Sequence, residues 1–129
     1  MNVLLDTHIW IWMCVSPEKL SVNAKKAIRS ANICYVSSIS AWEIAMLTNK
    51  NRLILTTSLD NWIHSSIEKA GLTLIDLNID IAIESSRLPE PCHRDPADRF
   101  LIATARTENL SLITADKLIR NYSHCKTIW

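Results

Sequence analysis

A chain of 129 residues, of which 48% are hydrophobic and 21% charged, has the composition of a folded globular protein rather than of a disordered one. The length suits one domain, residues 1–129, that buries roughly two-thirds of the surface of its unfolded form. Fourteen Lys and Arg against thirteen Asp and Glu give a net charge of +1, so overall charge does not indicate nucleic-acid binding. No apolar run approaches the roughly 18 residues that cross a bilayer, and we expect no membrane partner.

The cysteines and the first residues bear on the cellular compartment. The four cysteines are scattered in a chain large enough to fold without disulfides, so we expect reduced thiols and a cytoplasmic protein. The two adjacent Cys and His pairs lack the usual gap between zinc ligands, which disfavours structural zinc. Residues 1–15 are apolar like a secretion signal, but Asp6 and His8 interrupt them and no basic residue precedes them. We therefore expect this segment to be part of the folded protein.

The first part of the chain predicts two strands and three helices. The predicted strands and helices cover residues 2–5, 9–13, 17–29, 33–36 and 39–48. Asp6-Thr7 is expected to cap the first helix, and Ser16-Pro17 to open the second, which has one apolar and one basic face. Serines precede the third helix as caps, and Glu43 falls on its apolar side. A carboxylate therefore faces the interior at this point.

The rest of the chain continues the alternation. Residues 49–57 predict a polar, basic loop with Lys50 and Arg52 exposed, and we favour a solvated linker over a substrate-contacting patch. Further strands and helices are predicted over residues 58–70, 72–75, 78–88, 96–108, 110–113 and 116–120, with a strand or sheet edge at 126–129. Gly71, the only glycine, suits the left-handed position after a helix, and Asp116 suits an N-cap.

This alternation of strands and helices predicts an α/β fold whose parallel sheet is covered on both faces. Ligands in such folds bind beyond the carboxyl ends of the strands. Asp6 and Asp116 lie at the ends of predicted strands, but so does Asp76. Spacing alone does not decide which of these acids meet.

The stretch from residue 93 to 105 places an acid on a buried helical face. Asp98 shares that face with Leu101, Ile102 and Ala105, because positions three, four and seven apart lie on one side of a helix. A buried carboxylate without a partner is costly. We therefore expect a cation or a hydrogen-bond donor opposite Asp98.

Four acids lie at the borders of apolar segments: Asp6, Glu43, Asp98 and Asp116. Carboxylate oxygens suit Mg²⁺ or Mn²⁺, ions that promote phosphodiester hydrolysis. If these four bound metal, nine acids would remain against fourteen basic residues, and a surface charge of +5 would be compatible with a polyanionic substrate. With one glycine the chain has no P-loop, dinucleotide fingerprint or serine elbow. From spacing alone, a helix cap or a surface ion pair remains the commoner explanation of each acid.

Four runs, at residues 4–8, 40–45, 93–105 and 112–116, together resemble VapC-like PIN-domain toxins of type II toxin-antitoxin systems. The resemblance implies a three-layer α/β/α sandwich with strand order 3-2-1-4-5 and a Mg²⁺- or Mn²⁺-dependent ribonuclease. It also implies homodimerisation and inhibition by a small antitoxin protein. Carried over by position, the catalytic and metal-binding acids are Asp6, Glu43, Asp98 and Asp116. The acid directly before the Arg-Phe-Leu-Ile helix is the ligand in that pattern, which selects Asp98 over Asp95.

Other polar residues are expected to support the site. Asp95 is predicted to cap its helix or to assist without binding metal, and Thr114 to hydrogen-bond a neighbouring acid or a water. His8 and His93 are predicted to be structural, because a water activated by a metal needs no histidine base. Five basic residues are candidates for RNA phosphate contacts, although each alone is more often a solvated charge: Lys50, Arg52, Arg94, Arg99 and Lys117.

The resulting hypothesis is a toxin that hydrolyses RNA by in-line attack of water on phosphorus, leaving 5′-phosphate and 3′-hydroxyl ends. Two alternatives stay open. One is a PIN-fold RNA-processing nuclease without an antitoxin, and the other is a non-catalytic module that binds proteins. Trp10, Trp12 and Trp62 are expected either in the core or on a dimer and antitoxin surface.

Overall fold

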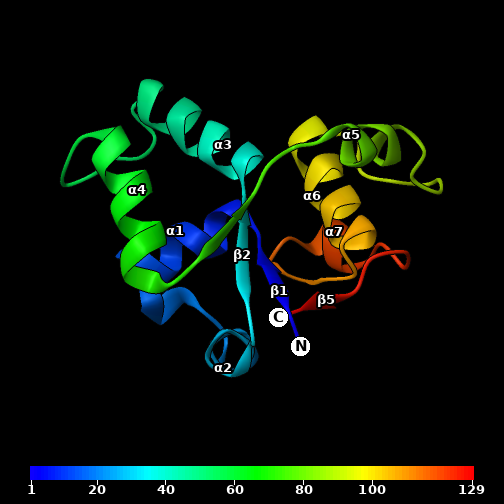
Figure 1. The fold of residues 1–129 in the computed structure, drawn as a ribbon, viewed down its shortest axis with the longest axis horizontal. Coiled ribbons are helices and arrows are strands. Elements are labelled where there is room, and N and C mark those ends of the chain that lie inside the picture. Colours follow the sequence, from blue (N-terminus) through cyan, green and yellow to red (C-terminus); the bar gives the residue numbers. More distant parts are fainter.

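The computed structural model describes residues 1–129 and contains one five-stranded sheet flanked by helices (Figure 1). All neighbouring strands pair in parallel, in the order β3-β2-β1-β4-β5. The α/β/α sandwich and the strand order implied by the sequence resemblance are therefore confirmed. The strands are β1 (Val3–Leu5), β2 (Cys34–Ser37), β3 (Thr73–Ile75), β4 (Ser111–Ile113) and β5 (Thr127–Ile128).

Seven α-helices and one 3₁₀ helix lie between the strands. They are α1 (Thr7–Val15), η1 (Pro17–Lys19), α2 (Val22–Ser30), α3 (Ser38–Asn49), α4 (Leu59–Ala70), α5 (Ile79–Ser86), α6 (Pro96–Thr107) and α7 (Lys117–Arg120). Every α-helix is preceded by a residue whose side chain accepts a hydrogen bond from a backbone N–H of the first turn, which is the role of an N-cap. These caps are Asp6, Ser21, Ser37, Ser58, Asn78, Asp95 and Asp116. Helix α4 ends at Gly71, whose φ of 65° is left-handed as predicted.

The prediction that a helix opens at Ser16-Pro17 and continues to about residue 29 is wrong. Pro17 instead begins the short η1, and α2 follows only after Leu20, whose backbone is extended and whose side chain is buried. Ser21 then caps α2 through its hydroxyl oxygen. Proline fits the first turn of a helix, so it marks a start without fixing a length. Burial of Leu20 in the core accompanies the break.

The two faces of the sheet carry separate cores. In β1, Val3 and Leu5 point to one face and Leu4 to the other, as the two-residue period of a strand requires. Val3 and Leu5 pack with residues of α1, α2, α3 and α4, whereas Leu4 packs with residues of α6 and α7. Figure 1 shows α1 and α4 on one side of the sheet and α5, α6 and α7 on the other. The carboxyl ends of β1 and β4 lie between these two groups of helices.

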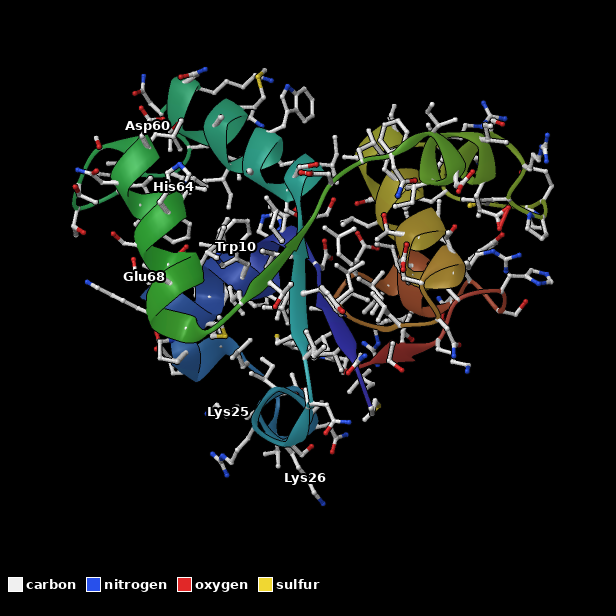
Figure 2. The ribbon with its side chains drawn as sticks, viewed as in Figure 1. Trp10, Lys25, Lys26, Asp60, His64 and Glu68 are labelled. Atoms are coloured by element: carbon white, nitrogen blue, oxygen red, sulfur yellow. The ribbon has the colours of Figure 1, made fainter.

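Trp10 is a core residue, in agreement with the prediction for the tryptophans. Its side chain is fully buried, its ring centroid lies 5.9 Å from that of Trp62, and its Nε1 donates to Ser66 Oγ at 3.0 Å. Figure 2 shows Trp10 on α1 on the side of α4, while Lys25 and Lys26 point outward from α2. The basic face predicted for α2 is thus exposed.

All four cysteines are free thiols, as expected. None of them belongs to a group of side chains placed to bind a metal ion. No helix is both long enough and apolar enough to cross a bilayer.

Candidate active site

A pocket of about 380 Å³ lies at the carboxyl ends of β1 and β4, where parallel sheets usually bind ligands. Eight residues line it: Asp6, His8, Trp12, Glu43, Asp95, Asp98, Ala115 and Asp116. Five of these are acids and none is Lys or Arg. A larger hollow of about 640 Å³ lies beside α1 and α4, but no acidic side chain lines it. The cluster of acids makes the smaller pocket the candidate site.

Asp6 links the end of β1 to the start of α1. It accepts the Thr7 amide on Oδ1 at 2.7 Å and the Thr114 hydroxyl on Oδ2 at 2.6 Å. Its side chain is buried, and burial raises the pKa of Asp6 above its usual value even though both hydrogen bonds lower it. The carboxylate is thus fixed in direction at both oxygens while its ionised form remains poorly solvated.

Glu43 reaches the same pocket from the second turn of α3. The Thr7 hydroxyl donates to Glu43 Oε1 at 2.5 Å and lies 2.8 Å from Ser40 Oγ. Because a hydroxyl has one proton, a Thr7 that donates to Glu43 accepts from Ser40. Burial raises the pKa of Glu43, and the charge of Asp6 adds to the increase.

Asp98 lies in the first turn of α6, beside the loop that precedes the helix. Its Oδ2 lies 3.0 Å from His93 Nε2, which is the partner that burial of this acid required. Burial raises the pKa of Asp98 to about 8. The charges that add to this increase belong to Asp6, Asp95, Glu43 and Asp116. The carboxylates are thus close enough to repel one another.

Asp116 and Asp95 both combine a place in the pocket with helix capping. Asp116 Oδ1 accepts the amides of Leu118 at 2.8 Å and Ile119 at 3.3 Å, at the start of α7. Asp95 Oδ1 accepts the Asp98 amide at 3.2 Å, at the start of α6. The predicted capping role of Asp95 is confirmed, and it also lines the pocket.

The donor set fits a hard divalent cation. Several carboxylates converge, their pKa values are raised by burial and mutual repulsion, and no Lys or Arg lines the pocket to neutralise them. Ligand atoms of His93, Asp98 and Asp116 lie within 4.8 Å of one another. Oxygen-rich sites of this kind suit Mg²⁺ and Mn²⁺.

The remaining predicted residues are placed as follows. Thr114 is fully buried and joins Asp6, whereas Asp76 is exposed at the end of β3 and does not line the pocket. The Arg99 guanidinium is occupied within the protein, because it donates to the carbonyls of Ser85 and His93 at 3.1 and 3.3 Å. The other four basic candidates are exposed: Lys50, Arg52, Arg94 and Lys117.

Sequence reasoning did not assign a contact in the site to four side chains that shape it. Thr7 and Ser40 support Glu43, His93 contacts Asp98, and Trp12 lines the pocket. Two of them had a local signal, because Thr7 directly follows an acid and Ser40 lies one helical turn before another. His93 and Trp12 had no signal beyond their residue type.

Comparison with known proteins identifies the fold as that of a PIN domain. The family model for the PIN domain matches residues 3–124, so the chain belongs to this family. It is similar to ribonuclease VapC22 of Mycobacterium tuberculosis (strain ATCC 25618 / H37Rv), with 32% identity over 130 residues that cover 99% of this chain and 98% of that protein. The resemblance to VapC-like PIN-domain toxins is thereby confirmed.

Solved structures share the fold at lower sequence identity. A chain of VapBC2 from Rickettsia felis, bound to a DNA fragment from the promoter, has a TM-score of 0.71 and 18% identity, covering 98% of this chain and 97% of that one. A chain of VapBC-1 from nontypeable Haemophilus influenzae has a TM-score of 0.67 and 16% identity, covering 98% and 96%. A chain of FitAcB from Neisseria gonorrhoeae has a TM-score of 0.61 and 22% identity, covering 98% and 96%.

Proposed function

We propose that this protein is a metal-dependent endoribonuclease that acts as the toxin of a toxin-antitoxin pair. The observation that carries the proposal is the convergence of five carboxylates, without a neutralising Lys or Arg, in one pocket at the carboxyl ends of β1 and β4. The similarity to a ribonuclease over almost the whole chain supports cleavage of RNA. The similarity to toxin-antitoxin complexes supports an antitoxin partner.

The acids that would hold Mg²⁺ or Mn²⁺ are Asp6, Glu43, Asp98 and Asp116. A divalent cation there supplies the positive charge that polarises a phosphodiester and stabilises the leaving oxygen. The chain's own residues orient the ligands: Thr114 fixes Asp6 and Thr7 fixes Glu43. Preorganised ligands lower the cost of assembling the site.

Basic side chains outside the pocket are the candidates for contacts with the rest of the RNA. The exposed side chains of Lys50, Arg52, Arg94 and Lys117 are the proposed phosphate contacts. Arg99 leaves this set because its guanidinium binds two backbone carbonyls of the protein. Trp12 and His8, one helical turn apart with ring centroids separated by 6.1 Å, offer the aromatic surface in the pocket.

We also propose a homodimer. Four exposed apolar side chains lie between β3 and α5 or within them: Leu74, Leu77, Ile79 and Ile83. β3 is an edge strand, so this apolar segment accompanies an open sheet edge. A second copy of the chain would cover both.

Two other functions share the fold. An RNA-processing nuclease without an antitoxin would have no short neighbouring reading frame encoding a DNA-binding segment and an amphipathic tail. A non-catalytic module would fail to bind Mn²⁺ in calorimetry, although all four acids are present here.

The most informative test is sequencing of cleaved RNA ends after brief expression in cells. The wild type is compared with Asp98→Asn and with Asp76→Asn, a control acid that is exposed at a strand end outside the pocket. We expect new 5′-phosphate ends with the wild type and the control but not with Asp98→Asn. Equal end profiles for all three proteins and an empty vector would refute the proposal.

A further inference from the structure

The imidazole of His93 faces Asp98 from the loop that leads into α6. Its Nε2 lies 3.0 Å from Asp98 Oδ2, and the two side chains are 16% and 15% exposed. The other ring nitrogen, Nδ1, accepts the backbone amide of Asp95 at 3.1 Å. Both ring nitrogens therefore have defined partners.

These partners fix which nitrogen carries the proton. A nitrogen that accepts a hydrogen bond has a free lone pair, so Nδ1 is unprotonated. A neutral imidazole with an unprotonated Nδ1 carries its proton on Nε2. His93 is therefore a hydrogen-bond donor to Asp98.

The same geometry argues against His93 as a metal ligand. His93 Nε2 belongs to the group within 4.8 Å that also includes Asp98 and Asp116. Ligation through Nε2 would move the proton to Nδ1, and a ligating histidine normally donates that proton to an acceptor. Here Nδ1 faces the Asp95 N–H, which is itself a donor.

The loop around His93 is held by α6 itself. Arg99 donates to the His93 carbonyl at 3.3 Å and to the Ser85 carbonyl at 3.1 Å, which ties the loop to the end of α5. Asp95 contributes its amide to the imidazole and its carboxylate to the cap of α6. His93, Asp95, Asp98 and Arg99 thus form one connected hydrogen-bond network.

We infer that His93 is a positioning residue for the proposed metal site: it donates from Nε2 to Asp98 Oδ2 and leaves Oδ1, which has no protein partner, for the cation. This inference rests on the proposed function, because it assumes that Asp98 binds a metal. It assigns His93 neither proton transfer nor direct ligation.

Two substitutions separate donation to Asp98 from packing of the loop. His93→Gln places an amide N–H close to the position of Nε2, whereas His93→Asn keeps only a polar group near Nδ1. Mn²⁺ affinity is measured by calorimetry, and unfolding by urea shows that each variant folds. We expect Gln to stay within about threefold of the wild type and Asn to lose about 10- to 100-fold, the usual effect of removing a partner of a metal ligand. His64→Asn, an exposed histidine on α4 (Figure 2), is expected to match the wild type.

The tautomer is tested directly in the metal-free protein. Nitrogen-15 spectra of the histidines, assigned with His93→Gln, should show a protonated Nε2 and an unprotonated Nδ1 for His93. A proton on Nδ1, or equal Mn²⁺ affinities for the Gln and Asn variants, would overturn the inference. If the wild type binds no Mn²⁺, the proposed function fails, and the metal-free spectra still decide whether His93 donates to Asp98.

Discussion

The Thr114 hydroxyl donates to Asp6 Oδ2 at 2.6 Å and accepts the Asp116 amide at 3.0 Å. One buried side chain after β4 therefore connects the Asp6 carboxylate to the backbone of Asp116, two acids that follow the neighbouring strands β1 and β4. Removing that hydroxyl should disturb both acids at once.

Thr114→Val keeps the shape of the side chain and removes the hydroxyl. We expect the free energy of unfolding at pH 7.5 to fall by about 1.5–3 kcal/mol, because a buried hydrogen bond to a charged group is lost. Urea denaturation measures the change. Thr114→Ser retains the hydroxyl and should lose less, so a Ser variant as unstable as the Val variant would contradict this explanation.

The metal-free protein should become less stable as the pH rises. The pKa of Asp98 is 3.8 in its unperturbed form and about 8 in the folded protein, so the folded state holds the proton more tightly. The proton on Asp98 therefore stabilises the folded state. This contribution is fully present below pH 4 and is lost as the pH rises through the folded pKa of about 8. In between, each pH unit lowers the free energy of unfolding by up to about 1.4 kcal/mol through Asp98.

Urea unfolding in EDTA between pH 5.5 and 7.5 measures this dependence. Asp98→Asn should flatten the slope, although Asp6 and Glu43 contribute in the same direction because burial raises their pKa values as well. An Asn variant with the wild-type slope would show that Asp98 does not titrate in this range.

Arg99 and Lys117 should respond in opposite ways to loss of charge. Arg99 is 19% exposed and donates to two backbone carbonyls, so Arg99→Gln should lower the free energy of unfolding by about 1–3 kcal/mol. Lys117 is exposed, so Lys117→Gln should change stability by less than about 0.5 kcal/mol but weaken RNA binding. Filter binding and urea denaturation give the two readouts, and the reverse pattern would return Arg99 to the RNA contacts.

The proposed dimer face can be tested by introducing one charged side chain into it. Ile79 is 77% exposed at the start of α5, so Ile79→Glu should leave folding intact and shift the protein to a monomer in analytical ultracentrifugation. Ile54, 87% exposed in the loop before α4, provides the control Ile54→Glu. A monomeric wild type, or two variants that dimerise equally, would exclude this face.

Local patterns in the sequence predicted most of the fold. Apolar periodicity and capping residues located the strands and nearly all helices, because both depend on neighbours along the chain. The start of α2 was missed because the burial of Leu20 is a tertiary effect. The strand order was predicted only from the family resemblance, because the residues of a strand do not determine which strand it pairs with.

The site was predictable only in part for the same reason. Asp6 and Asp116 were candidates because they are acids at the ends of predicted strands. Asp76 has the same local pattern but lies outside the pocket. The contact between His93 and Asp98 depends on how a loop folds back on a helix. No sequence spacing encodes that direction.

Asp6, Glu43, Asp98 and Asp116 are proposed to bind a divalent metal ion, with which the protein cleaves RNA. The most direct measurement is the initial rate of cleavage of an end-labelled RNA by purified protein in Mg²⁺ or Mn²⁺, for the wild type, Asp98→Asn and Asp76→Asn. We predict cleavage by the wild type and Asp76→Asn that EDTA abolishes, and a rate at least about 100-fold lower for Asp98→Asn. Cleavage by Asp98→Asn at the wild-type rate, with contaminating nuclease excluded, would contradict the claim.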